Sequence, residues 1–357
     1  LAEQTDVTGL LIRSAKPDIF IAGADLKELS TARGERLDSL IATGQALFNR
    51  IADLPYPAVA AIHGACVGGG YELALACDWR IASDSPATKI GLPESQLGIL
   101  PAWGGTTRLP SLLGLQDALP VILSGKLYSA ALAKRKGLVD EIVPKEHLKS
   151  YALTYLTKGK RHHTHNPITH NQAVAALIRV QAQKELQKKT HGHYPGPEAA
   201  LEVAVASIGR TRAQSQQAER DAIARLAGLP QTANLIHLFF LQERAKKHRH
   251  TDAEPRKIHR AAVIGAGVMG SSIAYWLSTR GIETTLQDIS DEALARGMKS
   301  ISCLYVDAVK HHVVSKTEAA RGLDRIHPAS GKIPLHNCDL IIEAAVEELS
   351  IKKKIFS

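Results

Sequence analysis

Hydrophobic residues in the first 146 positions alternate between short unbroken runs and stripes at helical spacing. Short β-favouring runs predict strands, and the stripes predict helices between them. The predicted strands are 7–14, 19–23, 58–64 and 79–84, and the predicted helices are 24–30, 37–54, 71–78 and one that begins near 104. The run AVAAIHG at 58–64 is apolar enough for a strand buried on both faces. Alternation of strands and helices predicts a layered α/β domain.

From about 147 to 254 the pattern becomes helical. Apolar stripes recur at 198–209, 218–228 and 233–247, with few strand-like runs between them. We interpret this region as a helical connector, and an independent all-helical domain is the alternative. The pattern then returns to α/β, with predicted strands at 260–267, 283–288 and 338–348 and a helix at 271–281.

These changes of pattern divide the 357 residues into three parts. We predict an α/β domain at 1–146, a helical linker region at 147–256 and a second α/β domain at 257–357. The sequence starts at Leu1 without an initiator methionine and stops at Ser357 as a helix begins. We therefore expect it to be a piece of a longer protein.

The net charge is +9, from 44 Lys and Arg against 35 Asp and Glu, and the excess basic residues cluster. The clusters are 159–165, 187–193 and 244–250. Such runs are usually solvated faces or loops, and the functional alternatives are a phosphate-bearing ligand, an anionic membrane surface or nucleic acid. Aromatic residues make up only 4% and no nucleic-acid-binding motif accompanies the charge, so we predict no nucleic-acid partner.

Cysteines and histidines predict no metal centre. The four cysteines lack CxxC spacing, which fits a reducing compartment, and Cys66 and Cys77 are expected to be buried as small hydrophobic residues. The histidine-rich tracts at 162–170 and 248–250 have no carboxylate or cysteine at ligand spacing, so we interpret them as loops. No apolar run reaches the roughly 18 residues that a membrane span needs.

A triple glycine and two glutamates mark a candidate catalytic site. Gly68, Gly69 and Gly70 directly precede an apolar helix, which is a costly choice for an ordinary turn and suggests that the backbone approaches a ligand. Glu72 follows in the first turn of that helix, and Glu94 lies in the segment GLPES. Taken singly, Glu72 could stabilise the helix dipole and Glu94 could be a surface residue. Together with the glycines they suggest proton transfer beside an oxyanion site.

A second glycine motif lies near position 265. Gly265, Gly267 and Gly270 fit GxGxxG after a predicted strand and at the start of a helix, and Asp288 follows Gly265 by 23 residues at the end of the next strand. In dinucleotide-binding folds these glycines allow a tight turn, close approach of the pyrophosphate and close helix packing. The acidic residue accepts from the ribose hydroxyls and disfavours a 2′-phosphate, so we predict NAD as the cofactor.

Several segments together resemble the enoyl-CoA hydratase/isomerase (crotonase) family, and their continuation is similar to the multifunctional α-subunits of fatty-acid β-oxidation. The segments that carry the first resemblance are 21–29, 57–83 and 90–110, and those that carry the second are 193–204, 218–226, 239–247 and 263–274. The resemblance covers essentially the whole chain. It implies a crotonase-like domain of ββα repeats, a helical linker and the start of a Rossmann dinucleotide-binding domain.

For the hydratase part the resemblance implies that Glu72 holds and activates water. Glu94 would deliver or remove the proton at Cα and shuttle it between C2 and C4 in the isomerase reaction. The backbone N–H groups of Ala24 and Gly69 would form the oxyanion hole. The coenzyme A moiety would contact the backbone around 22–26, which we assign as Ala22, Ala24, Asp25 and Leu26. From the residues alone, Asp25 is expected to cap the helix that it precedes.

For the dehydrogenase part the resemblance implies that Gly265, Gly267, Met269, Gly270 and Asp288 bind NAD. Val346, Glu347 and Lys352 would lie near the nicotinamide-ribose side. The resemblance also places the first crotonase strands before Leu1, and the catalytic His–Glu pair of the dehydrogenase beyond Ser357.

The resulting expectation is an enzyme that hydrates 2-trans-enoyl-CoA, with Δ3–Δ2 isomerisation, followed in the complete protein by NAD-dependent oxidation. The alternatives are a silent CoA- or NAD-binding scaffold and a different acyl-CoA reaction on the same fold. The resemblance further implies acyl-CoA substrates and a thiolase β-subunit as partner in a hetero-oligomer. The basic surface would serve that contact or a peripheral contact with a membrane. The expected location is the bacterial cytoplasm, with the mitochondrial matrix as the alternative. Acyl chain length has no sequence signal.

Overall fold

A computed structural model describes residues 6–161, 171–248, 253–311, 313–331 and 333–356. The chain forms two compact units, residues 1–248 and residues 249–357. Each unit has its own hydrophobic core. In the described part of the chain, no helix is long and apolar enough to cross a membrane.

Two four-stranded sheets form the framework of the first unit among the described residues. One is fully parallel, in the order β1 (Leu10–Arg13), β3 (Ala58–Ile62), β5 (Trp79–Ser83) and β8 (Glu141–Val143). The other has the order β2 (Ile19–Ile21), β4 (Ala65–Val67), β6 (Lys89–Gly91) and β7 (Tyr128–Ser129), with β7 antiparallel to β6. The pairs β1–β2, β3–β4 and β5–β6 each place one strand in the first sheet and the next in the second, and helices follow each pair, whereas α6 (Ala130–Arg135) separates β7 from β8. This is the expected ββα repeat.

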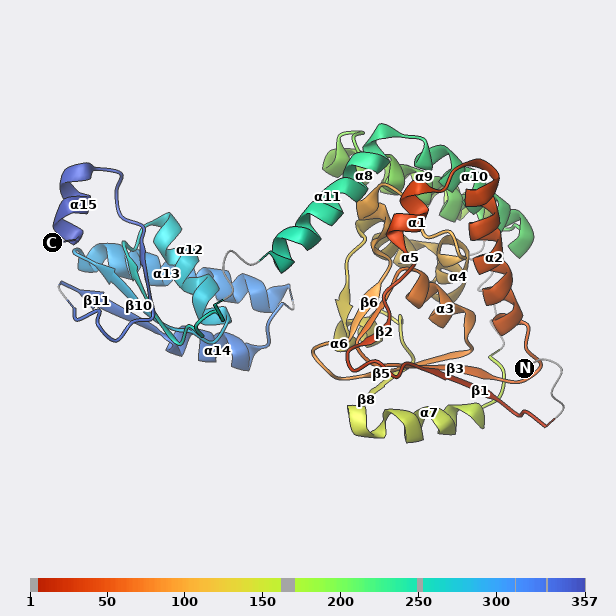
Figure 1. The fold of residues 1–357 in the computed structure, drawn as a ribbon, viewed down its shortest axis with the longest axis horizontal. Helices are drawn as coiled ribbons and strands as arrows, with labels where there is room; N and C mark the ends of the chain where they lie inside the picture. The colour runs from red at the N-terminus through yellow and green to blue at the C-terminus, as the bar shows by residue number, and fades with distance from the viewer. Residues whose placement is uncertain (1–5, 162–170, 249–252, 312, 332, 357) are drawn as a thin grey trace. The chain divides into compact units, whose positions relative to one another are not determined.

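Strand β3 shows why its sequence is apolar throughout. Ala58, Ala60 and Ile62 face the larger core, whereas Val59 and Ala61 face a smaller core beneath α7 (Leu148–Leu156). Side chains alternate across a strand, so a strand covered on both faces needs apolar residues at every position. Figure 1 shows α7 on one side of this sheet and the other helices of the unit on the opposite side.

One predicted strand is divided in the structure. The expected strand 58–64 ends at Ile62, and the chain turns at Gly64 (φ +77°) before β4 enters the second sheet. A Cβ on Gly64 would overlap the backbone of Asp18, so the turn needs glycine. The triple glycine therefore follows β4 of the second sheet and not the strand predicted from the sequence.

Helices connect the strands and cover the larger core. In chain order they are α1 (Leu26–Thr31), α2 (Gly34–Ala52), α3 (Gly69–Ala76), the 3₁₀ helix η1 (Pro93–Leu97), α4 (Gly105–Leu113), α5 (Leu115–Ser124), α6 (Ala130–Arg135) and the 3₁₀ turn η2 (Lys145–His147). Cys66 and Cys77 are buried and free, as expected.

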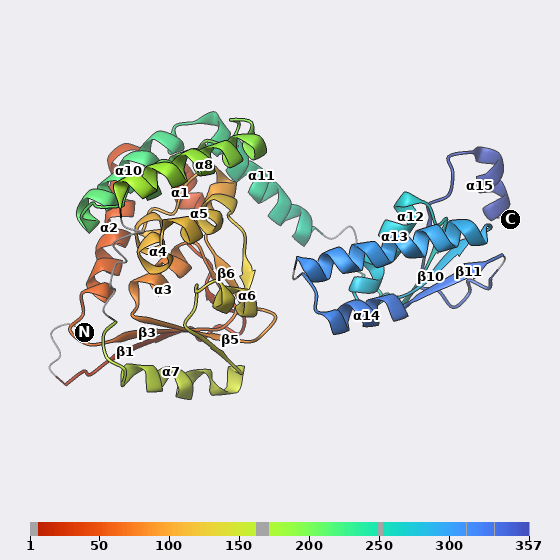
Figure 2. The same cartoon turned by 180° about the vertical axis from the view of Figure 1, so that it is seen from behind.

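The helical region packs onto the same core as the sheets. It comprises α8 (Gln172–Thr190), α9 (Pro195–Ala206), α10 (Arg212–Ala227) and α11 (Pro230–Lys247). Leu201, Ile223 and Leu226 are buried in the cluster that also contains Ile62 and Leu109. Figure 2 shows α8 and α10 running across the helical layer of the unit. The three-part division at 146 and 256 stays a prediction, whereas the compact unit extends to His248.

The second unit is a parallel sheet with helices. Its strand order is β11 (Ile326–Ser330), β10 (Glu283–Asp288), β9 (Arg260–Ile264) and β12 (Leu340–Glu343). Its helices are α12 (Val268–Thr279), α13 (Asp291–Lys310), α14 (Lys316–Asp324) and α15 (Leu349–Ile355). The chain moves outward from β9 to β10 and β11 and then returns to the other side of β9. In open α/β sheets such a change of direction leaves a ligand crevice at the carboxyl ends of the strands.

Candidate active site

A cavity of about 440 Å³ in the first unit brings most of the predicted hydratase residues together. It lies among the loop before α1, the start of α3, η1, the loop before α4 and helix α11. Its lining includes Ala22, Ala24, Leu26, Gly69, Glu72 and Glu94. The predicted residues, which are up to about 70 positions apart in sequence, thus line one cavity. Asp25 does not line it; its carboxylate caps α1 by accepting from the N–H of Lys27 at 2.8 Å.

Glu72 is held by two backbone groups. It is buried in the first turn of α3, and its Oε1 accepts from the N–H groups of Trp103 and Gly105, each at 2.8 Å. One carboxylate oxygen is therefore fixed by the loop before α4. A carboxylate held in this way has a defined orientation in which the other oxygen can accept a proton or hold water.

Glu94 approaches the same cavity from η1. Pro93 starts this 3₁₀ helix, and its first turn places Glu94 beside the glycine turn. The Oε2 atom of Glu94 is shielded from solvent and has no hydrogen-bond partner in the described part of the chain. Buried polar atoms are normally satisfied, so an unpaired carboxylate oxygen at a cavity indicates a place for a ligand or water.

Burial changes the protonation of both carboxyl groups, and repulsion by neighbouring carboxylates adds to the change for Glu72. Burial raises the pKa of Glu94 to about 7. Burial also raises the pKa of Glu72 well above its usual value, and the nearby charges of Glu94 and Glu219 raise it further, while the two N–H groups oppose the rise. With this pKa, Glu94 is suited to give and take a proton near neutral pH.

The structure explains the three glycines at the start of α3. Gly68 has φ +57° and ψ −130°, and a Cβ there would lie 2.6 Å from Oε1 of Glu94. A Cβ on Gly69 would lie 2.5 Å from the Trp103 ring, and one on Gly70 would overlap the carbonyl oxygen of Ile21. The triple glycine is therefore required for close approach to the site as well as for backbone conformation.

The two proposed oxyanion donors lie close together. An ideal Cβ built on Gly69 would lie 3.8 Å from the nitrogen of Ala24. As the first residue of α3, Gly69 has no intrahelical acceptor for its N–H. Within the described ranges, the N–H of Ala24 donates to no protein acceptor either. Two neighbouring N–H groups at a cavity can hold one developing oxyanion.

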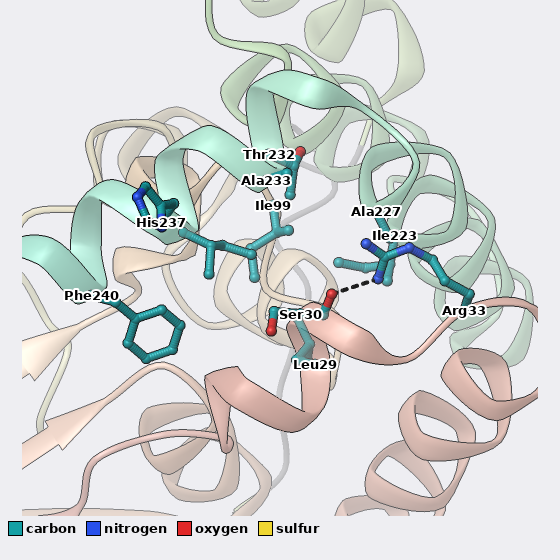
Figure 3. A pocket seen from close by; sticks show the side chains of 11 residues that line it. Leu29, Ser30, Arg33, Ile99, Ile223, Ala227, Thr232, Ala233, His237 and Phe240 are labelled. Atoms are coloured by element: carbon teal, nitrogen blue, oxygen red, sulfur yellow. Dashed lines mark hydrogen bonds between the residues drawn. The ribbon is translucent and has the colours of Figure 1, made fainter.

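A second, smaller cavity of about 190 Å³ shares part of its lining with the candidate site. It lies between α1 and the helices α10 and α11, as Figure 3 shows. Leu29, Ile99 and Ile223 line both this cavity and the larger one. The apolar wall of the candidate site thus extends towards the helical region.

Several residues of the larger cavity are not among those predicted from the sequence. Trp103 lines it and packs edge-on against Phe48 at 5.7 Å between ring centroids. Phe239, Gln242 and Lys246 contribute to it from α11. Trp103 lies within the segment that carried the resemblance, so a signal existed for it. No local pattern could show that α11, more than 140 residues after Glu94, returns to the site.

Glu94 also makes the stability of the first unit depend on pH. Its pKa is about 7 in the folded chain against 4.5 in a model compound, so the folded state retains a proton that the unfolded state loses between these values. The wild type should lose stability as pH rises from about 4.5 to 7. We expect Glu94→Gln to be more stable than wild type at pH 8 by about 3 kcal/mol, with no difference at pH 4.

Urea unfolding at several pH values, followed by circular dichroism, measures this difference. The exposed Glu28 supplies the control, because Glu28→Gln removes only a surface ion pair with Arg36 and should change the stability little at either pH value. A pH-independent difference for Glu94→Gln would contradict the raised pKa.

In the second unit the glycine motif adopts the geometry that the sequence predicted. Gly265 has φ +106°, and a Cβ there would lie 2.7 Å from the carbonyl oxygen of Ala344. A Cβ on Gly270 would overlap the carbonyl oxygen of Gly265, whereas one on Gly267 would meet nothing within 4 Å. The turn thus leaves open space at the start of α12, where a pyrophosphate would need it.

Asp288 ends β10 beside this turn. One carboxylate oxygen accepts from the N–H of Ala266 at 2.7 Å and the other from the N–H of Ser290 at 3.2 Å. Met269 is 71% exposed at the start of α12. These residues therefore lie together at the carboxyl ends of β9 and β10.

The segment after β12 supplies the remaining predicted residues. Val346 is exposed, and Nζ of Lys352 lies 2.6 Å from Oε2 of Glu343 and 3.4 Å from Oε2 of Glu347. The hydrogen bond to Glu343 raises the pKa of Lys352. Glu343 pairs in register with Ile264 of β9, which places this segment at the same edge as the glycine turn.

Among the described residues, no group of three or more His, Cys, Asp or Glu side chains could hold a metal ion. The tract 162–170 and residues 249–250 of the second histidine-rich tract lie outside these residues.

Residues 1–195 match the family model of enoyl-CoA hydratase/isomerase. The chain belongs to the enoyl-CoA hydratase/isomerase family. Residues 260–357 match the NAD-binding domain of 3-hydroxyacyl-CoA dehydrogenase. The resemblance inferred from the motifs is thereby confirmed for both parts.

Curated relatives include the fatty acid oxidation complex subunit alpha of Vibrio parahaemolyticus and of Aliivibrio fischeri. They are 35% and 36% identical over 99% of this chain, and the chain spans about half of their length, 52% in each case. Among solved structures, human mitochondrial Δ3-Δ2-enoyl-CoA isomerase aligns with a TM-score of 0.50 over 69% of this chain and 84% of that one. At 23% identity this match supports the crotonase fold alone.

Proposed function

We propose that the first unit adds water across the double bond of 2-trans-enoyl-CoA to give 3-hydroxyacyl-CoA. The proposal depends on the paired carboxyl groups of Glu72 and Glu94 in one cavity with the free N–H groups of Ala24 and Gly69. Membership of the hydratase/isomerase family and the names of the curated relatives support it.

In the proposed reaction Glu72 orients a water molecule with the carboxylate oxygen that the backbone does not hold. The water oxygen bonds to C3 as one water proton passes to the carboxylate of Glu72, and Glu94 gives its proton to C2. Electron density moves onto the thioester oxygen during this addition. The N–H groups of Ala24 and Gly69 stabilise that oxygen, and one such donor is typically worth about 3 kcal/mol. In Δ3–Δ2 isomerisation Glu94 removes a proton from C2 and returns it at C4.

Coenzyme A would bind along the loop before α1. Ala22, Ala24 and Leu26 line the cavity there and supply backbone groups. Asp25 would contribute through its backbone only, because its carboxylate caps α1. Lys246 also lines this cavity, and its positive charge suits a phosphate of the coenzyme.

Hydration of crotonyl-CoA, followed as loss of conjugated-enoyl absorbance, tests the proposal directly. Turnover by the whole protein would support it. A silent CoA-binding scaffold is the alternative from a different functional class. Tight binding of crotonyl-CoA without turnover would favour the scaffold and reject hydration.

The second unit would bind NAD, and the motif geometry is compatible with it. The open space at Gly267, the start of α12 and the carboxylate of Asp288 would hold the pyrophosphate and the ribose. Met269 and Gly270 would flank the pyrophosphate, and Val346, Glu347 and Lys352 would lie towards the nicotinamide ribose. When bound, NAD accepts the hydride from a 3-hydroxyacyl-CoA in the dehydrogenase reaction.

Replacing Asp288 by Asn should weaken NADH binding by about 10- to 100-fold, because a charge-assisted hydrogen bond to the ribose is lost. The amide oxygen can still accept from the N–H of Ala266, so the turn should remain folded. NADPH binding should change less. Fluorescence titration measures both affinities, with Asp291→Asn at the exposed start of α13 as the control. Equal losses for NADH and NADPH would contradict ribose recognition by Asp288.

We propose in addition that the complete protein pairs with a thiolase subunit in the bacterial cytoplasm, since the relatives are named as subunits of a fatty acid oxidation complex. The mitochondrial matrix is the alternative location, and the basic surface would serve the subunit contact or a membrane surface. Isolation of the tagged protein from its own cells and identification of the bound subunit tests this proposal.

A further inference from the structure

A buried carboxylate on the helical region lies behind the candidate site. Glu219 of α10 is 0% exposed and does not line the 440 Å³ cavity. Its Oε1 accepts from the hydroxyls of Thr106 at 2.6 Å and Thr107 at 2.8 Å, and its Oε2 accepts from Nε2 of Gln45 at 3.1 Å. Three donors suit an ionised carboxylate. Burying a charge costs free energy, and these three hydrogen bonds offset part of that cost. A carboxylate kept at such a position suggests a role beyond packing.

One of these partners fixes the first donor to Glu72. Nε2 of Gln45 also donates to the carbonyl oxygen of Ala102 at 2.7 Å. That carbonyl belongs to the same planar peptide group as the N–H of Trp103, which donates to Oε1 of Glu72. A trans peptide is rigid, so holding its carbonyl also directs its N–H.

The other partners fix the second donor. Gly105, whose N–H also donates to Oε1 of Glu72, is the first residue of α4, and Thr106 and Thr107 follow it in the first turn. Glu219 therefore ties down the start of α4 one residue beyond the donor. Both N–H groups that orient Glu72 are thus held, directly or through Gln45, by one carboxylate.

The surrounding groups fix Glu219 and Gln45 in their own orientations. Nη1 of Arg220 donates to Oε1 of Gln45 at 2.6 Å, which settles that the amide nitrogen faces Glu219. Arg220 in turn lies 3.3 Å from Asp38 on α2. The network therefore joins α2, α10 and the loop before α4.

We propose that Glu219, acting with Gln45, is a positioning residue of the hydratase site that holds the two backbone donors to Glu72. This inference rests on the proposed hydration activity. It makes the helical region part of the catalytic apparatus, although its buried carboxylate contacts no substrate. The ionisable groups that face Glu72 are Glu94 from η1, Glu219 from α10 and Arg108 from α4.

Replacing Glu219 by Gln places an amide against the amide of Gln45 and disturbs both donors. We expect kcat for crotonyl-CoA hydration by the whole protein to fall by about 10-fold, because misplacement of a catalytic group lowers the rate. KM should stay within about twofold, since Glu219 contacts no substrate. The exposed Asp221 on the same helix provides the control, and Asp221→Asn should leave both constants unchanged.

A second variant separates positioning from a general structural role. Gln45→Met keeps the charge of Glu219 but removes the donor to Ala102, so the N–H of Trp103 should loosen. That N–H lowers the pKa of Glu72, so its loss should move the acid limb of the kcat–pH profile to higher pH. The kcat of the double variant should lie within about twofold of that of the slower single variant, because both substitutions act through the same donors.

A normal kcat in both single variants would overturn the inference. So would a loss of kcat that matches the loss of folded protein and leaves the pH profile unchanged. If Glu219→Gln does not fold, Gln45→Met decides it alone. If neither folds, Thr107→Val at a half-buried position removes one donor to Glu219, and kcat should fall with KM retained. A wild type that does not hydrate crotonyl-CoA would instead reject the proposed function.

Discussion

Replacing Glu94 by Gln should lower kcat for crotonyl-CoA hydration by about 10³-fold, since a general acid typically contributes 10²- to 10⁴-fold. The amide retains the shape of the side chain but has no proton to give to C2. Burial sets the pKa of Glu94 at about 7, so the wild type can supply that proton near neutral pH. KM should change little, because the shape of the cavity is retained.

Glu72→Gln should reduce kcat to a similar extent for a different reason. The variant keeps one oxygen for the N–H groups of Trp103 and Gly105, but the group that faces the water becomes a neutral amide. Activity is measured as loss of enoyl absorbance, with Glu28→Gln as an exposed control. If Glu72→Gln and Glu94→Gln both keep wild-type activity, the proposed roles are wrong.

The second large effect is expected for Gly68→Ala. Its φ of +57° with ψ of −130° is unfavourable for alanine, and the new Cβ would lie 2.6 Å from Oε1 of Glu94. We expect kcat to fall by about 10²-fold as Glu94 moves. The free energy of unfolding should fall by about 2 to 4 kcal/mol from strain and overlap together.

Gly34 offers a control for the strain of a positive φ without any steric overlap. Its φ is +54°, and a Cβ there would meet nothing within 4 Å. Gly34→Ala should cost about 1 kcal/mol of stability and leave activity unchanged. Enzyme assay and urea unfolding of both variants separate strain from displacement of the carboxylate. Similar behaviour of the two variants would show that the contact with Glu94 is unimportant.

Much of the candidate site was accessible from short segments of the sequence. The glycine turn with Glu72 and the segment GLPES with Glu94 each carry a local signal, and the structure brings both acids to one cavity. The pairing of Asp288 with the glycine turn of the second unit was likewise anticipated from spacing. Such motifs are readable because a few neighbouring residues determine the backbone that they need.

Features that depend on distant contacts were not accessible in this way. Strand β11 and helices α13 and α14 were not assigned, although α13 has Ile301 and Tyr305 buried in the second core. The division between β3 and β4 depends on the approach of Asp18 to Gly64. Glu219 has an unremarkable helical neighbourhood, and its hydrogen bond to Thr106 spans 113 positions.

Because the sheets and helices α8–α11 share one core, gene fusion during evolution is restricted to certain points of the chain. Leu201 and Ile223 fill the same interior as Ile62, so a genetic exchange within the helical region would unite halves with mismatched interiors. The second unit has a separate interior built around Val263 and Leu286. Exchange between α11 and β9 would leave both interiors whole. Fusion partners are therefore most readily gained or lost at that point.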